Sequence, residues 1–338
     1  MANDAPQSTL VDALAAAHVQ PLWDRYRDLV PTEPRGTDPA MHWAWSAMQP
    51  LIDRAVREIT PEEAERRVLM LVNPAFGGEV TTTTNLFGGL QVLEPGESAR
   101  PHRHTLAALR FIMDGYGGAT IVNGKRCPMH EGDLILTPAW CWHEHVNDGH
   151  RRVVWFDGLD LPLARHLDAA FFEAGEPHDV PKDMGALPDE ALNWSGLLPA
   201  NHPAPQYSPL FRYAWMDAHS ALAALPPADD GSRLLRYVSP ATGRAVLPTL
   251  DCYLLGLAPQ SATRALRSMH NAVCVAVEGE GVSQIGDRRI EWGRHDVFTI
   301  PHWNWVSHKA GKGGATVFMM TDRELIRRMG YLREEQAG

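Results

Sequence analysis

Two histidines, His102 and His104, stand one residue apart in the stretch PHRHTLAALR. In a β-strand, residues i and i+2 face the same side, so the two imidazoles would project together. A third histidine, His143, lies in TPAWCWHEHVN after a Gly132–Asp133 turn, and an antiparallel strand could bring it opposite the pair. Neutral imidazoles bind Fe, Mn, Zn, Cu and Ni. Three of them on one side of a metal would leave positions open for substrate or oxygen, whereas ordinary core or surface histidines are the alternative reading.

The elements around these histidines change in character near residue 75. The first seventy residues have apolar side chains at helical spacing, and Thr60, Pro61 and Glu63 form a capping-box pattern that predicts a helix start. After residue 75, short β-type runs alternate with Gly, Pro and Asp, which indicates an all-β barrel or sandwich. The closing segment DRELIRRMGYLREEQ is expected to be helical.

Two of the β-rich blocks are related in sequence. Residues 113–145 and 277–308 both open on a glycine-containing turn, pass through a hairpin, and end on Pro followed by Trp-x-Trp. In this alignment Gly115 corresponds to Gly279, and His145 corresponds to His308. We therefore expect two copies of one barrel. The expected organisation is a helical arm (1–75), a metal-bearing barrel (76–165), a linker with helices and loops (166–244), a second barrel without metal ligands (245–322) and a helical tail (323–338).

Composition limits the possible partners. The 338 residues have a net charge of −10, which argues against nucleic acid or an anionic membrane as the main partner because both require a basic face. The four cysteines lack C-x-x-C spacing and are expected to be reduced thiols. The chain lacks a run of about 18 apolar residues and a signal-like N-terminus, so we expect a soluble cytoplasmic protein.

The spacing of the histidines resembles the cupin signature. The first cupin motif has Gly, five residues and His-x-His, which Gly96 and the His102–His104 pair match. The second has Gly, five residues, Pro, then His and Asn, which Gly132, Pro138, His143 and Asn147 match. The resemblance implies a mainly β bicupin fold of two jelly-roll barrels. Ala108 and Leu109 stand where cupins usually carry a glutamate ligand, so we expect three histidine ligands only.

The second block provides an internal comparison. The positions that correspond to His102, His104 and His143 are Leu266, Ser268 and Val306. His270 is present but two places out of register. We therefore expect no equivalent metal in the second barrel.

Longer stretches of the N-terminal half resemble the gentisate 1,2-dioxygenase family. They are EEAERRVLMLVNP, FGGLQVLEPGE, HRHTLAALRFIMDG, GDLILTPAWCWHEHVND and VVWFDGLDLP. This family of bicupin ring-cleaving enzymes includes salicylate and 1-hydroxy-2-naphthoate dioxygenases. The resemblance implies Fe(II) on His102, His104 and His143, an aromatic o-hydroxycarboxylate and O2 as substrates, and a homotetramer. The ring would open between the carboxyl- and hydroxyl-bearing carbons, giving maleylpyruvate from gentisate.

Residue chemistry suggests further roles at the site. Arg110 has the strand parity of His102 and His104, so it would point inward and require an anion, either the substrate or Asp157. His145 could take the phenolic proton, or it could be a core histidine bonded to backbone. Gln91 and Asp157 are candidates to orient ligands or substrate.

The substrate-binding candidates come from three segments. Arg66 and Arg67 lie in the N-terminal arm, where one of them could reach the substrate carboxylate, although a solvated helix face is the alternative. Phe87 and Leu106 are expected to contact the aromatic ring. By parity, Trp142 faces away from His143 and should lie in the core or an interface, while Trp140 could form part of the rim.

Two other functions remain compatible with these residues. A cupin isomerase, decarboxylase or diketone-cleaving dioxygenase could use Mn, Ni or Zn at three histidines, because selectivity among these metals depends on geometry and availability. A sensor or storage protein could hold a small aromatic acid without turnover.

Substituting one histidine from each barrel tests the assignment of the metal. We expect His104→Ala to abolish both iron binding, measured by metal analysis, and turnover, because it removes one of three ligands. His308→Ala should retain both. Equal losses from the two variants would show that the second barrel is wrongly assigned as metal-free.

Overall fold

The structure is a computed structural model that describes residues 9–36, 38–176, 187–192, 197, 200 and 206–337. The chain divides into two compact units, Met1–Thr37 and Asp38–Gly338. Among the described residues, no helix is both long enough and apolar enough to cross a membrane.

The first unit contains two short helices, α1 (Leu10–Ala16) and α2 (Tyr26–Leu29). Thr9 caps α1: its hydroxyl accepts a hydrogen bond from the Asp12 backbone N–H, and the Asp12 carboxylate accepts one from the Thr9 backbone N–H. Pro21 lies between the helices and interrupts the helical spacing of the sequence, because proline lacks the N–H that an interior helical position requires.

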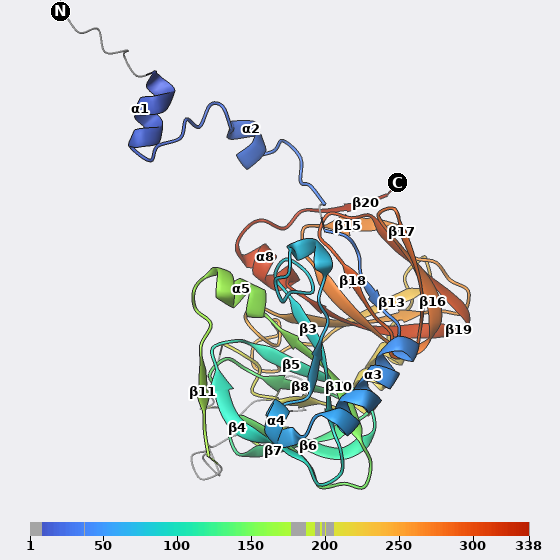
Figure 1. Ribbon diagram of the computed structural model, residues 1–338. Coiled ribbons are helices and arrows are strands. Elements are labelled where there is room, and N and C mark those ends of the chain that lie inside the picture. The colour runs from blue at the N-terminus through green and yellow to red at the C-terminus, as the bar shows by residue number, and fades with distance from the viewer. Residues whose placement is uncertain are drawn as a thin grey trace, which may run out of the picture. The chain divides into compact units, whose positions relative to one another are not determined.

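The first barrel of the second unit consists of two sheets, drawn mainly in teal and green in Figure 1. One sheet has the strand order β12-β8-β5-β10-β3-β2, and the other has the order β11-β4-β9-β6-β7. The strands are β2 (Val68–Met70), β3 (Phe87–Leu93), β4 (Ser98–His104), β5 (Ala108–Asp114), β6 (Tyr116–Val122), β7 (Lys125–His130), β8 (Leu134–Thr137), β9 (His143–Asn147), β10 (Val153–Leu159), β11 (Phe172–Ala174) and β12 (Arg212–Tyr213).

The second barrel is one curved sheet, drawn mainly in orange and red in Figure 1. Its main path is β1-β18-β16-β19-β14-β13, with β15, β17 and β20 paired at the side. The strands are β1 (His42–Trp43), β13 (Ser232–Arg236), β14 (Asp251–Leu257), β15 (Leu266–Ser268), β16 (Ala272–Ile285), β17 (Arg288–Gly293), β18 (Val297–Ile300), β19 (Val306–Thr321) and β20 (Glu334–Gln336).

Short helices connect and flank the barrels. They are α3 (Trp45–Glu58), α4 (Pro61–Ala64), the 3-10 turn η1 (Pro74–Phe76), α5 (Leu161–His166), α6 (Asp189–Leu192), α7 (Trp215–Ala224) and α8 (Arg323–Arg328). The capping box predicted at Thr60 and Glu63 is confirmed at the start of α4, although this helix spans only four residues.

Strand register confirms that the two barrels are copies. His102 pairs with His143 across β4 and β9, and Leu266 pairs with Val306 across β15 and β19. Thr120 pairs with His145, and Ser283 pairs with His308. Gly115 and Gly279 also correspond: both have positive φ, and a Cβ on either would lie about 2 Å from a backbone carbonyl oxygen, at 1.9 Å and 2.1 Å respectively.

The two barrels exchange one strand each. The segment before the first barrel supplies a strand to the second barrel, and the segment before the second barrel supplies a strand to the first. Strand β1, before the first barrel in sequence, pairs with β18 of the second barrel, and β12 pairs with β8 of the first. A buried aspartate anchors each exchange. Asp296 accepts the Trp45 N–H that begins α3, at 2.7 Å, and Asp133 accepts the Trp215 N–H that begins α7, at 2.8 Å. The exchange locks the two barrels together.

A shared apolar core fills the space between the barrels. It contains Leu90, Phe111 and Phe156 of the first barrel together with Leu254 and Phe318 of the second. The rings of Phe111 and Phe318 stack with centroids 4.1 Å apart. The opposite faces of β3, β5 and β10 are left to line the interior of the first barrel, because side chains alternate along a strand.

The flanking segments differ from the expected organisation. The expected helical arm also supplies β1 and β2 to the sheets, and the expected linker supplies β11, β12 and β13. The expected C-terminal helix ends at Arg328, and residues 334–336 pair with β15. In these segments the unpaired backbone N–H and C=O groups at the sheet edges favour strand pairing over the helix that the local spacing of apolar residues predicts.

The exchanged strands provide a test of how the barrels are held together. We expect Asp133→Ala and Asp296→Ala each to lower the free energy of unfolding by on the order of 3 kcal/mol, because each leaves a helix N–H and a charged or polar partner unpaired. Asp287→Ala, at an exposed turn, is the control and should change stability by less than about 0.5 kcal/mol. Urea unfolding measures all three, and equal effects would contradict the proposed anchoring.

Candidate metal centre and active site

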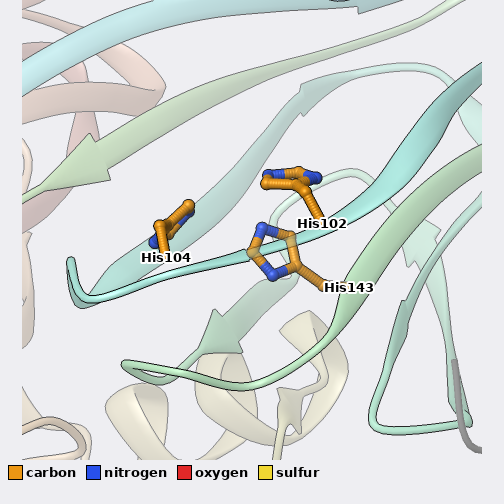
Figure 2. A group of neighbouring side chains, drawn as sticks. All are labelled: His102, His104 and His143. Carbon is orange, nitrogen blue, oxygen red and sulfur yellow. The ribbon is translucent and has the colours of Figure 1, made fainter. Parts of the chain in front are cut away.

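Three imidazoles converge inside the first barrel (Figure 2). His102 and His104 come from β4, and His143 comes from the neighbouring strand β9. One ligand nitrogen from each lies within 4.8 Å of the others, and all three residues are buried. Among the described residues this is the one group of three or more His, Cys, Asp or Glu side chains so placed. The structure thus contains the three-histidine site expected from the sequence.

Each imidazole is oriented by a backbone carbonyl two residues away. The Nδ1 atoms lie 3.1 Å from Arg100 O, 2.9 Å from Leu106 O and 2.9 Å from Cys141 O, for His102, His104 and His143 respectively. Since a carbonyl only accepts, each Nδ1 carries the proton and each Nε2 is a lone-pair donor. Nε2 of His143 is buried without any hydrogen-bond partner, as expected for an atom that binds a metal.

Burial and nearby cations keep these histidines neutral. Burial lowers the pKa of His102 to about 2, with a further contribution from Arg66. The pKa of His104 falls to about 4 for the same first reason, assisted by Arg110. Burial also holds the pKa of His143 well below its ordinary value. Neutral imidazoles are the form that binds metal ions.

Arg110 and Asp157 form a buried pair beside the histidines. They lie directly opposite each other on β5 and β10, with Arg110 Nε 3.4 Å from Asp157 Oδ1. The Arg110 guanidinium also donates to the Thr137 hydroxyl, and the Trp155 indole N–H donates to Asp157 at 3.0 Å. Burial raises the pKa of Asp157 to about 6, although Arg110 opposes the shift. The Arg110–Asp157 ion pair considered from the sequence therefore exists. It leaves other N–H groups of the Arg110 guanidinium able to donate hydrogen bonds.

His145 and Gln91 are two further buried polar residues of the first barrel. His145 is fully buried, its Nδ1 lies 3.0 Å from the Thr120 hydroxyl, and its ring centroid is 6.0 Å from that of His143. Its partner is thus a side chain rather than the backbone. Gln91 lies on β3 opposite Trp155 of β10. Within the described part of the chain, neither Nε2 of His145 nor Nε2 of Gln91 has a hydrogen-bond partner.

The structure separates the two arginines of the N-terminal segment. Arg67 pairs with Glu97 and donates to the carbonyls of Val56 and Ile59, so it is used in packing. Arg66 is one of the charges that lower the pKa of His102 and His145, which places it near the histidines. Burial lowers the pKa of Arg66 itself, and its Nε has no hydrogen-bond partner.

The predicted aromatic and aliphatic contacts have different surroundings. Phe87 is buried on the face of β3 that also carries Gln91, beside the Cα of Gly89. Leu106 is half-buried, and its carbonyl orients His104. Trp142 is buried and lies with Trp140 against the Arg103 guanidinium, on the opposite side of β4 from the ligands.

Phe172, which is 50% exposed, lies beside the histidines and was not predicted from the sequence. Strand β11 pairs with β4, and the Phe172 ring lies 5.3 Å from the His102 ring and 5.4 Å from the Arg66 guanidinium carbon. The signal was an extension of the internal repeat. Helices α5 and α8 begin directly after Asp160 and Asp322, and strands β11 and β20 follow each at the same spacing. An alignment extended past the barrels would have identified β11.

Unpartnered polar atoms concentrate at this site. Nine buried side-chain nitrogen or oxygen atoms of the described residues lack a hydrogen-bond partner, and five of them belong to Arg66, Gln91, Arg110, His143 and His145. Unpaired buried polar groups are costly. A metal would account for Nε2 of His143, and the atoms of Arg66, Gln91 and His145 indicate a ligand that carries polar atoms.

The second barrel has no comparable set at the corresponding positions. Register places Leu266, Ser268 and Val306 where the ligands stand, as expected from sequence. His270 bonds to the Ser268 hydroxyl at 2.6 Å. Like His145, His308 contacts a side-chain hydroxyl through Nδ1, which lies 2.7 Å from the Ser283 hydroxyl.

Known proteins share both the fold and the length of this chain. Residues 89–159 match the Cupin domain family. The chain is 34% identical over 329 residues to gentisate 1,2 dioxygenase 1 of Aquipseudomonas alcaligenes, covering 96% of this chain and 94% of that protein. It is 36% identical to 5-aminosalicylate 1,2-dioxygenase of Comamonas sp, covering 98% and 92%.

A solved structure extends this similarity to three dimensions. Salicylate 1,2-dioxygenase from Pseudoaminobacter salicylatoxidans, in adducts with gentisate, superposes with a TM-score of 0.90 at 30% identity. The match covers 100% of this chain and 96% of that one. With the three-histidine centre inside the first barrel, these similarities show that the chain belongs to the gentisate 1,2-dioxygenase family of bicupin ring-cleaving dioxygenases.

Proposed function

We propose that this enzyme uses Fe(II) and O2 to cleave an aromatic o-hydroxycarboxylate, with gentisate as the substrate and maleylpyruvate as the product. The observation that supports this most is the set of unpartnered buried atoms of Arg66, Gln91 and His145 beside the three histidines, with Nε2 of His143 left for the metal. A hydroxybenzoate carries a carboxylate and an adjacent hydroxyl, which together offer the anionic and hydrogen-bonding oxygen atoms that such a cluster needs.

Iron fits the donor set of the barrel. Three neutral imidazoles with free Nε2 atoms are suited to a divalent first-row metal, and three protein ligands leave other positions exchangeable. When bound, Fe(II) would supply the electrons and the open positions that let O2 react with a chelated ring. His102, His104 and His143 would hold it.

Two cations would bind and orient the substrate. Near the histidines Arg66 is half-buried and Arg110 is buried. Among the described residues the buried Nε of Arg66 has no hydrogen-bond partner, whereas Nε of Arg110 faces Asp157 at 3.4 Å. A buried guanidinium favours a carboxylate partner because the geometry of its donors matches two oxygen atoms. We assign the substrate carboxylate to Arg66, because Arg110 already pairs with Asp157 and can stabilise negative charge that develops during oxygen insertion.

His145 would accept the phenolic proton. Burial and the nearby Arg110 hold its pKa well below the ordinary value, so the imidazole is neutral. With the proton on Nδ1, donated to the Thr120 hydroxyl, Nε2 would be the acceptor. Thr120 fixes the ring through Nδ1. Gln91 would hydrogen-bond a substrate oxygen, and Phe87, Leu106 and Phe172 would enclose the ring.

The cleavage would join both atoms of O2 to the substrate. The bond between the carboxyl-bearing and hydroxyl-bearing ring carbons breaks, and each of these carbons gains one oxygen atom, so gentisate plus O2 equals maleylpyruvate in atoms. Salicylate is the second candidate, because salicylate 1,2-dioxygenase is a structural neighbour over the whole chain. The homotetramer and the cytoplasmic location stay predictions.

Oxygen uptake by the iron-loaded enzyme tests the proposed reaction. The protein is purified anaerobically, reconstituted with Fe(II) and supplied with gentisate, salicylate or 1-hydroxy-2-naphthoate in parallel. We expect uptake with gentisate to be fastest, with one O2 consumed for each ring opened. Fully iron-loaded protein that consumes no O2 with any of the three would refute the proposal.

The two neighbouring arginines give a matched test of substrate binding. We expect Arg66→Gln to raise KM for gentisate by about tenfold or more, because a buried ionic contact to the carboxylate contributes roughly 1.5–3 kcal/mol. Arg67→Gln should leave KM within about twofold and instead lower the unfolding midpoint, because it breaks the Glu97 pair. Steady-state kinetics and thermal unfolding are measured for both variants. A larger increase in KM for Arg67→Gln than for Arg66→Gln would assign the substrate carboxylate to Arg67 instead.

A further inference from the structure

The second barrel contains a partly open cavity of about 530 Å³, here called the C-terminal cavity. Its apolar lining includes Leu255, Leu266, Ile300, Val306 and Met319. This volume lies in the range of sites that hold small organic molecules. A duplicated barrel that had become only a structural support would be expected to fill such a space with side chains, because protein interiors are close-packed.

The C-terminal cavity corresponds in position to the iron site of the first barrel. Register places Leu266 and Val306 at the positions of His102 and His143. Met319 pairs with Cys274, as Asp157 pairs with Arg110. The three metal ligands and the Arg110–Asp157 pair are thus replaced by Leu266, Ser268, Val306, Cys274 and Met319. A ring-sized space is left without the metal ligands and buried charges of the first barrel.

Polar side chains also line the cavity, among them Ser268, His270, Thr321 and His308, and Ser268 and His270 hydrogen-bond to each other. His308 is 6% exposed and lines the cavity, and its Nδ1 bonds to the Ser283 hydroxyl at 2.7 Å. Among the described residues, its Nε2 has no hydrogen-bond partner. Burial lowers the pKa of His308 to about 4, so its ring is neutral and can exchange one hydrogen bond with a hydroxyl group.

The charged residues of the lining do not favour an anion. Arg323 pairs with Glu334 at 2.6 Å, and Arg264 lies 3.7 Å from Asp229. Both pairs are partly or largely exposed. A carboxylate would have to enter an apolar interior without a free cation, which is costly, whereas a neutral hydroxyl would not.

We propose that the C-terminal cavity is a second, metal-free binding site that takes a neutral phenol or naphthol. The ring lies between the apolar side chains of Leu255, Val306 and Met319, and its hydroxyl bonds to Nε2 of His308. This site is independent of the reaction proposed for the first barrel, since no ligand of the iron contributes to it.

Titration of the iron-loaded enzyme with 1-naphthol under anaerobic conditions tests the site. We expect calorimetry to give one molecule per chain, undiminished when gentisate saturates the first barrel. With protein labelled at the methionine methyl carbons, the Met319 resonance should shift. The proposal is overturned if 1-naphthol does not bind below 1 mM, if gentisate displaces it, or if the Met319 resonance is unaffected.

Variants locate the two kinds of contact. We expect Val306→Phe to weaken 1-naphthol binding at least tenfold by filling the space. Ser307→Phe is the matched control, because the neighbouring residue is not part of the lining, and it should change binding less than twofold. His308→Phe should weaken 1-naphthol about fivefold while leaving 1-methylnaphthalene, which lacks the hydroxyl, within twofold. Circular dichroism checks that each variant is folded, and equal effects of Val306→Phe and Ser307→Phe would place the ligand elsewhere.

Discussion

The reciprocal contact between two buried aspartates and two helix starts holds the molecule together. Asp133 and Asp296 each accept a backbone N–H from the helix that precedes the other barrel, and each also accepts from a side chain of the exchanged strand, Arg212 or His42. A carboxylate at a helix N-terminus is stabilised by the helix dipole and by unpaired N–H groups. Because the contact is made twice, neither barrel has its full sheet without the segment that precedes the other.

This exchange supports the polar interior of the first barrel. Burying a guanidinium, a carboxylate and four imidazoles in one place costs several kcal/mol for each ion. The opposite faces of the strands that carry them recover stability, because Phe111 and Phe156 pack into the core shared with the second barrel. The sheet also keeps each Nδ1 on its carbonyl, which directs the Nε2 atoms toward one another.

The two copies of the barrel share the same contacts on their outer faces but differ in the side chains of their interiors. Arg103 lies over Trp140 and Trp142 and bonds to Glu173, while Arg267 lies over Trp303 and Trp305 and bonds to Glu335. These arginine contacts join β11 to β4 in the first barrel and β20 to β15 in the second, and they are alike in both copies. Inside the first copy stand the three histidines and the Arg110–Asp157 pair, and the corresponding positions of the second copy hold Leu266, Ser268, Val306, Cys274 and Met319. The shared outer contacts therefore stabilise both barrels, and the interior side chains decide which ligand each barrel accepts.

The sequence by itself determined the barrels, the duplication and the three ligands, because alternation, turn glycines and histidine spacing are local patterns. It also determined the loss of ligands from the second barrel. Only the tertiary structure decided that Arg66 rather than Arg67 lies near the histidines, since both neighbours have the same local chemistry and differ in what the fold places beside them. The same holds for Phe172, which reaches His102 through strand pairing between segments about 70 residues apart. Contacts of this kind depend on how distant strands meet, and local sequence carries little information about them.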